Sequence, residues 1–129
     1  MNVEIRNKPG FAVLFVTLKP GDTIPNIAQL LQRNVILFGD RVVINENRTG
    51  KYIGTTWNKF YNNILNIVTN LRRYGFKVGD KMVIYSPNRL EMLELELAIM
   101  ASGGISVPIF AFFHRETAEL LINHSKAEY

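Results

Sequence analysis

The sequence contains no cysteine, no apolar run long enough to cross a bilayer and no cluster of basic residues. Without cysteine, a disulfide framework and a thiolate metal site are both excluded. The most apolar early run, residues 11–18 (FAVLFVTL), is far shorter than the roughly 20 residues of a transmembrane helix. The turn-forming residues 19–22 (KPGD) follow it where a secretory signal would have a small-residue cleavage site. We therefore expect a cytoplasmic protein without a transmembrane segment.

The net charge of +4 comes from scattered residues, and Arg72-Arg73 is the only adjacent basic pair. Nucleic-acid binding needs basic residues gathered in a patch or stripe, so we expect no nucleic-acid partner. The apolar share of 47% and the charged share of 20% are typical of a globular protein. The 129 residues suffice for one domain or part of one.

The first half of the chain predicts short elements separated by turns. Residues 11–18 are expected to form a strand, and residues 23–33 a short helix with Pro25 in its first turn. A second strand is expected from Val42, followed by a hairpin loop over residues 45–50 (NENRTG) and a third strand near Tyr52. This is the N-terminal hairpin region of the predicted fold.

Residues 57–74 have the clearest helical pattern in the sequence. Apolar residues recur every three or four positions and asparagines occupy the opposite face at intervals of four (Phe60, Ile64, Ile67, Leu71; Asn58, Asn62, Asn66, Asn70). Thr55 or Thr56 is expected to cap the start. Gly75 is expected to end the helix in the left-handed conformation, with Phe76 making the accompanying apolar contact.

The next segment predicts a strand, a helix and a strand. Residues 82–85 (MVIY) are apolar on both faces, as in a buried parallel sheet. Asn88 and Glu91 have the spacing of a capping box for a helix over residues 90–101. A second strand follows over residues 105–109, with Pro108 at its end or at a sheet edge. The short connection requires a parallel, right-handed βαβ unit.

A last helix is expected over residues 115–123, and the chain ends where a doubly wound fold would place its next strand. The predicted fold class is therefore α/β, a partial doubly wound sheet with one βαβ unit. Residues 1–129 are expected to be a single incomplete domain. An uncovered sheet edge tends to pair with another chain, so self-association is also expected.

Two glycine-containing stretches have the composition of phosphate-binding loops. Gly50-Lys51 resembles the end of a Walker loop, but Asn45 and Tyr52 stand where that loop needs a glycine and a serine or threonine. Residues 54–56 (GTT) lead from the hairpin into a helix, where threonines are expected as caps. We interpret both stretches as structural.

The ionisable residues predict no reactive site. His114 and His124 have no metal-ligand spacing to any other residue, so a surface or helix-end role is expected. Glu91, Glu94 and Glu96 could in principle supply an acid–base pair, but Glu91 and Glu94 share a polar helix face, which indicates a solvated surface. We therefore predict no catalytic, cofactor-binding or metal-binding residue in this chain.

Read in order, five stretches resemble the opening subdomain of the acyl-CoA synthetase, adenylation-domain and luciferase superfamily. They are residues 23–31 (its first helix), 56–60 (a Thr-Tyr-x-Glu-Leu helix start), 74–83 (Gly-x-x-x-Gly-Asp-x-Val), 99–108 (Gly-Ala-x-x-x-Pro) and 117–126 (a helix ending in Ser and Lys). Asn88 also follows the third stretch as the asparagine of the family does. Two residues depart from the pattern, Lys59 in place of glutamate and Gly104 in place of alanine.

The resemblance implies an enzyme that activates a carboxylic acid with Mg-ATP as an acyl-adenylate and transfers the acyl group to coenzyme A. The strand around Ser106 is closer to fatty-acyl-CoA synthetases than to amino-acid adenylation domains. The family's phosphate loop, its adenine- and Mg-binding motifs, its hinge and its catalytic lysine would all lie beyond Tyr129. The resemblance therefore implies an inactive N-terminal portion whose partner is the rest of its own ligase chain. The alternative is a stand-alone α/β binding module without catalysis.

Overall fold

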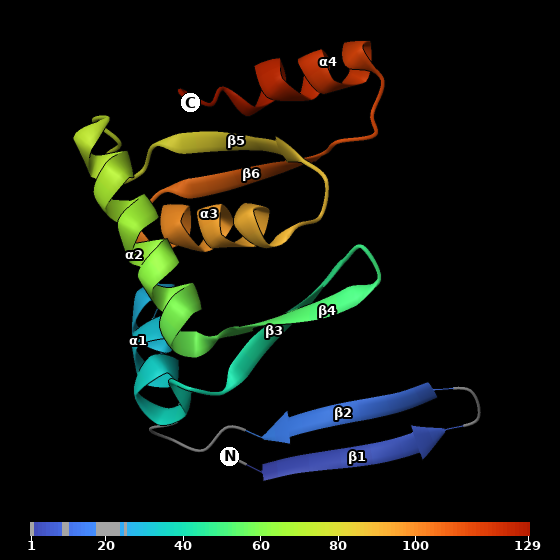
Figure 1. Ribbon diagram of the computed structural model, residues 1–129. Coiled ribbons are helices and arrows are strands. Elements are labelled where there is room, and N and C mark those ends of the chain that lie inside the picture. The colour runs from blue at the N-terminus through green and yellow to red at the C-terminus, as the bar shows by residue number, and fades with distance from the viewer. Residues whose placement is uncertain (1, 9–10, 18–23, 25) are drawn as a thin grey trace.

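A computed structural model describes residues 2–8, 11–17, 24 and 26–129 of the chain. Within these residues the backbone forms three two-stranded sheets and four helices (Figure 1). In chain order the elements are β1 (Asn2–Lys8), β2 (Phe11–Thr17), α1 (Ile27–Phe38), β3 (Val42–Arg48), β4 (Lys51–Thr56), α2 (Trp57–Arg73), β5 (Lys81–Ser86), α3 (Leu90–Ala101), β6 (Ile105–Phe110) and α4 (Arg115–Ser125).

The strand predicted over residues 11–18 is confirmed as β2, and it pairs with a strand that was not predicted. β1 and β2 are antiparallel, with Asn2 opposite Thr17 and Lys8 opposite Phe11. Apolar and polar residues alternate in residues 2–6, which is the signal that would have identified β1. The predicted turn at residues 19–22 and the proline at position 25 lie outside the described residues.

Helix α1 begins and ends later than predicted. The Asn26 side chain caps it by accepting a hydrogen bond of 2.9 Å from the Gln29 amide, so the helix starts at Ile27. It continues to Phe38, five residues past the predicted end at Arg33. The error arose because residues 35–38 (VILF) are uniformly apolar, and such a run has no helical periodicity to reveal it.

The hairpin of β3 and β4 is longer than predicted and its turn is shorter. Arg48 pairs with Lys51, so the turn consists of Thr49 and Gly50 alone. Both have positive φ angles, 53° and 83°, as in the type I′ turns that match the twist of a hairpin. The loop predicted over residues 45–50 is therefore wrong, because the polar residues at its start continue β3.

Helix α2 confirms the predicted helix and both of its ends. The Thr56 hydroxyl accepts a hydrogen bond from the Lys59 amide. At the other end Gly75 has φ of +89°, its amide bonds the Arg72 carbonyl at 3.0 Å, and the Phe76 amide bonds the Leu71 carbonyl at 3.0 Å. These two bonds define the Schellman motif.

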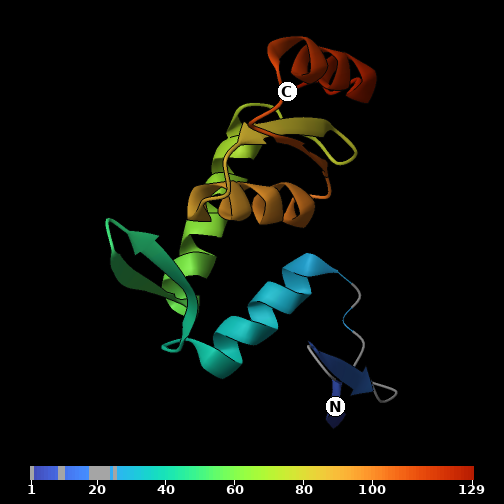
Figure 2. The ribbon, with the colours of Figure 1, turned by 90° about the vertical axis from the view of Figure 1, so that its right-hand side faces the viewer.

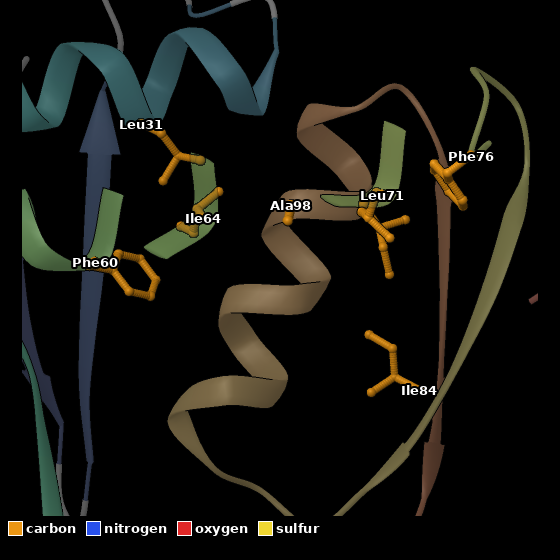
Figure 3. Close-up of a cluster of buried hydrophobic side chains, with 8 residues drawn as sticks. Leu31, Phe60, Ile64, Leu71, Phe76, Ile84 and Ala98 are labelled. Carbon is orange, nitrogen blue, oxygen red and sulfur yellow. The ribbon is translucent and has the colours of Figure 1, made fainter. Parts of the chain in front are cut away.

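The core lies among α1, α2, α3 and the inner face of β5. Figure 3 shows Leu31, Phe60 and Ile64 on one side of α3, and Leu71, Phe76 and Ile84 on its other side, toward the strands. Ile64 and Ile99 are the largest fully buried side chains among the described residues. The apolar face predicted for α2 is confirmed as the face that packs in this core.

The predicted βαβ unit is confirmed: β5 and β6 are parallel, with Met82 opposite Ser106 and α3 connecting them. Helix α3 covers one face of this sheet and α4 the other in both views (Figures 1 and 2). The predicted cap is wrong, since α3 is preceded by Arg89, whose side chain makes no capping bond, and Asn88 lies one residue too early. Arg89 keeps an extended φ of −156°, so the helix starts after it.

The last three residues return to the sheet on the side of β5 opposite β6. The Tyr129 amide donates to the Lys81 carbonyl at 3.3 Å, and the Val83 amide donates to the Tyr129 carbonyl at 2.9 Å. This is the pattern of a parallel bridge between Tyr129 and Met82. The chain thus crosses from β6 over β5, and right-handed crossovers in opposite directions put α3 and α4 on opposite faces.

Candidate functional site

The sheet topology locates the candidate site at the carboxyl ends of β5 and β6. In open parallel sheets, ligands bind outside the carboxyl ends of the strands, at the position where the chain reverses its direction across the sheet. That reversal occurs here around β5, with β6 on one side and Tyr129 on the other. The candidate site therefore comprises two loops, residues 87–89 after β5 and residues 111–114 after β6.

The loop after β5 leads into a group of ion pairs at the start of α3. Glu91 lies 3.1 Å from the Arg89 guanidinium and 3.5 Å from that of Arg48, which also pairs with Glu46. The pKa of Glu91 is lowered first by a hydrogen bond from its own backbone amide, then by the two arginine charges. Glu91 is therefore a poor proton donor near neutral pH, and the pairs connect the β3–β4 hairpin to α3.

The loop after β6 carries an exposed aromatic cluster. The centroid of the Phe110 ring lies 5.2 Å from that of Phe112 and 5.7 Å from that of Phe113. The interplanar angles are 62° and 73°, so both pairs are edge-to-face. The Tyr85 hydroxyl donates to the Ala111 carbonyl at 2.9 Å, which ties the loop to β5. Phe112 is 75% exposed. Exposed aromatic groups that are held in place suit contact with an apolar ligand or another protein surface.

A cavity of about 370 Å³ lies between β6 and α4, beside the aromatic cluster. Its wall is mostly apolar and it includes two polar residues, His124 and Ser125. The Ser125 hydroxyl donates to the Ile122 carbonyl at 2.7 Å and accepts a bond from the Ala127 amide, so it serves the helix end. A cavity of this size is within the range of small-molecule sites. It provides apolar enclosure near the carboxyl edge.

Both candidate phosphate loops have the structural role that the sequence indicated. Gly50 lies in the hairpin turn, and Lys51 is the first residue of β4, not of a helix. Thr55 is buried at the end of β4, and Thr56 caps α2. A Cβ atom at Gly54 would lie 3.0 Å from the Val42 side chain, so this glycine accommodates strand packing.

The two histidines lie at opposite ends of α4. His114 precedes the helix, and its carbonyl accepts the Ala118 amide at 3.0 Å, while its side chain makes no capping bond. His124 lies in the last turn, as expected of a helix-end position, and borders the cavity. Over the described ranges, no three histidine, aspartate or glutamate side chains are grouped closely enough to hold a metal ion.

The prediction of a solvated face for Glu91 and Glu94 is correct for Glu91 and wrong for Glu94. Glu94 is 5% exposed, and one carboxylate oxygen accepts a hydrogen bond of 2.8 Å from the Asn63 side chain of α2. Helix α3 is apolar nearly all round because it lies between α2 and the sheet, and a helix of this kind is buried. That composition was the signal that Glu94 faces a neighbouring helix.

The sequence model of the AMP-binding enzyme family matches residues 31–129. The chain is 37% identical over 75 residues to 4-hydroxybutyrate–CoA ligase 2 of Metallosphaera sedula, covering 57% of this chain and 14% of that protein. It is 29% identical over 83 residues to long chain acyl-CoA synthetase 5 of Arabidopsis thaliana, covering 64% of this chain and 12% of that protein. The chain thus spans about one-seventh or less of the length of these relatives.

The fold is similar to that of solved adenylation enzymes. The N-terminal subdomain of Klebsiella oxytoca NpsA superposes with a TM-score of 0.73 at 19% identity, over 82% of this chain and 27% of that one. The two departures from the family pattern, Lys59 at an exposed position of α2 and Gly104 beneath the Phe76 ring, lie away from the carboxyl edge of the sheet. From residue 31 to its last residue, this chain belongs to the AMP-binding enzyme family.

Proposed function

We propose that this chain is the N-terminal part of an acid–CoA ligase that acts in the cytoplasm. The whole enzyme would activate a carboxylic acid, with a preference for fatty acids, by reaction with Mg-ATP to give an acyl-adenylate and pyrophosphate. It would then transfer the acyl group from the adenylate to coenzyme A. The part described here would supply the packed α1–α2–α3 layer and the first parallel strands. It would have no activity alone, and its partner would be the remainder of the same ligase.

The observation that carries this proposal is the family match over residues 31–129, which includes the whole βαβ unit and α4. The fatty-acid preference is supported by the name of the Arabidopsis relative and by the apolar surroundings of the carboxyl edge, where Phe110, Phe112 and Phe113 are exposed. The resemblance implies that the family's ATP-, Mg- and CoA-binding motifs lie beyond Tyr129. We therefore assign the chemistry to residues outside it.

The test begins with the coding sequence after codon 129. We expect it to encode, within some tens of residues, a Ser/Thr/Gly-rich loop that ends in lysine. The product of that longer reading frame is then assayed for carboxylate-dependent ATP–pyrophosphate exchange with oleate and with acetate, beside the 129-residue chain. Exchange that is faster with oleate, and absent from the short chain, is expected.

Three results would contradict parts of this proposal. A stop codon directly after residue 129 would favour the stand-alone binding module. Faster exchange with acetate would overturn the fatty-acid preference while leaving the ligase assignment intact. Exchange catalysed by residues 1–129 alone would show that the chemistry lies within this chain.

A further inference from the structure

A cavity of about 290 Å³ lies where α1, α2 and the end of α3 meet. Leu31 and Ile64 form part of its wall, and Figure 3 shows both on the side of α3 that is turned away from the strands. Helix α3 therefore separates this α1–α2 cavity from the sheet. No described residue of the two candidate-site loops lines it. The cavity is thus independent of the carboxyl edge.

Helices α1 and α2 run in opposite directions along the α1–α2 cavity. The Asn58 amide donates to the Gly39 carbonyl at 2.9 Å, so the end of α1 lies at the start of α2 (Figure 1). Ala28, in the first turn of α1, and Arg72, in the last turn of α2, both line the cavity. The wall extends along α2 from Tyr61 to Arg72, which is about 16 Å at a helical rise of about 1.5 Å per residue. The cavity is therefore elongated along α2.

The floor of the α1–α2 cavity is apolar, and its polar groups are at the rim. Leu31 and Ile64 are 3% and 1% exposed, and Val68 adds further apolar surface between the helices. Thr69 and Arg72 are exposed. The Thr69 hydroxyl donates to the Leu65 carbonyl at 2.9 Å, so its proton is already used within α2. An elongated apolar floor of this kind favours an extended hydrocarbon chain.

The two helices along the cavity contain basic residues and no aspartate or glutamate. The charged residue of α1 is Arg33, and those of α2 are Lys59, Arg72 and Arg73. Arg72 is the one that lines the cavity, and no acidic side chain of the described residues forms an ion pair with it. The first turn of α1 adds the positive end of a helix dipole, which offsets the negative end of α2. These charges favour an anionic group beside Arg72.

We propose that the α1–α2 cavity binds a linear aliphatic monocarboxylate, with its chain along α2 over Leu31 and Ile64 and its carboxylate paired with Arg72. Inorganic phosphate would leave the apolar floor unfilled, and an alkyl cation would be repelled by both helices. A bound acid would stabilise the contact between α1 and α2, away from the carboxyl edge. The inference does not rest on the proposed function, because residues 1–129 supply every group that it uses.

The test titrates the 129-residue chain with decanoate at neutral pH, below its micelle concentration, and follows the Val68 methyl signals by NMR. We expect these signals to shift saturably, at lower decanoate concentrations than any shift at Ile109, which lines the cavity beside β6. Decyltrimethylammonium has the same chain and the opposite charge, and it should bind about tenfold or more weakly. No ATP or coenzyme A is present, so failure here is distinguishable from failure of the ligase assignment, which pyrophosphate exchange measures.

Arg72 and Arg73 provide a matched pair of variants, because both are exposed in the last turn of α2 and only Arg72 lines the cavity. Arg72→Gln should weaken decanoate binding by about tenfold, as expected for the loss of a charge-assisted hydrogen bond. Arg73→Gln should weaken it by less than about twofold, since exposed charges that make no direct contact contribute little. Ala28→Leu keeps every charge and a strong helix former in α1 while filling the cavity, so it should abolish binding.

Four results would overturn the proposal. Equal weakening by Arg72→Gln and Arg73→Gln would mean general attraction to positive charge instead of a pair with Arg72. Decyltrimethylammonium binding as tightly as decanoate would mean that the carboxylate is not recognised. Retained binding in Ala28→Leu would place the ligand elsewhere. The absence of a saturable shift at Val68 would mean that the α1–α2 cavity does not admit the chain.

Discussion

The two faces of the β5–β6 sheet differ in how completely they are packed. On the face of α3, side chains from α1, α2 and α3 are excluded from water, with Ile64 at 1% exposure and Ile99 at 0%. On the face of α4, Ala118 is buried, but Leu120 of the same helix is 68% exposed. Burial of apolar surface is the main stabilising contribution to folding. The chain therefore has one finished layer, which stabilises it, and one layer with apolar surface left for contact.

The largest effect should distinguish these two layers directly. Ile64→Ala removes a fully buried side chain and should lower the free energy of unfolding by about 2–5 kcal/mol. Leu120→Ala, on the open side, should change it by less than about 0.5 kcal/mol. Urea denaturation of both variants measures the difference. Equal losses would mean that α4 is as well packed as α2.

The contact between Phe76 and Gly104 should give the next largest effect. A Cβ atom at Gly104 would lie 2.4 Å from the Phe76 ring, which is itself buried, so Gly104→Ala should destabilise by roughly 1–3 kcal/mol. This explains why glycine replaces the alanine of the family pattern. Phe76→Leu removes the clashing ring atoms, so in a double-mutant cycle the two changes together should cost less than their sum. Additive losses would contradict the clash.

At Gly75, which follows α2, a substitution should affect stability through the backbone conformation and not through side-chain contacts. Apart from its two chain neighbours, no described residue has an atom within 4 Å of a Cβ built on Gly75, yet its φ of +89° is strained for other residues. We expect Gly75→Ala to lower the free energy of unfolding by about 1 kcal/mol through this strain alone. Gly75→Asn is the control, since asparagine tolerates positive φ better and should lose less. An unchanged denaturation midpoint for Gly75→Ala would contradict the Schellman motif.

The smallest effect should be the pH dependence of the C-terminal bridge. The pKa of Glu128 is lowered, mainly by the hydrogen bond from the Lys81 amide. A carboxyl group with a lowered pKa in the folded state stabilises above its usual pKa and loses that contribution as the pH falls through the lowered value. The Tyr129–Phe76 contact should therefore loosen only as the pH falls below the usual pKa of a glutamate, which NMR shifts of Tyr129 would report. Glu128→Gln should remove the dependence, and an identical acid transition in that variant would assign it to another group.

The sequence predicted helix α2 better than the helices that pack against it, for physical reasons. Helix α2 shows a 3.6-residue period with caps at both ends, and local signals of this kind determine a helix with little help from elsewhere. The end of α1 and the capping residue of α3 lack such signals, and both were predicted wrongly, although the bounds of α3 itself were predicted correctly. The burial of Glu94 depends on Asn63, 31 positions away, and spacing within one helix does not reveal a partner at that distance.

The candidate site could be predicted only through topology. The carboxyl edge depends on which side of β5 the chain returns to, and the hydrogen bonds of Tyr129 establish this, not any motif. The aromatic cluster at residues 110–113 was visible in the sequence, but its attachment through Tyr85 to the Ala111 carbonyl was not. No reactive residue was proposed from the sequence, and the assignment of chemistry to the remainder of the ligase stays a prediction.

Hydrogen exchange along β5 in the 129-residue chain tests the pairing of the two edges of this strand most directly. We predict slow exchange for the Ile84 amide, which faces β6, and for the Val83 amide, which bonds Tyr129 at 2.9 Å. The Tyr85 amide lies on the same edge as the Val83 amide, but no backbone carbonyl of the described residues accepts from it on that edge. It should therefore exchange much faster than both. Equally slow exchange at all three amides would contradict the account, because the edge would then already be covered.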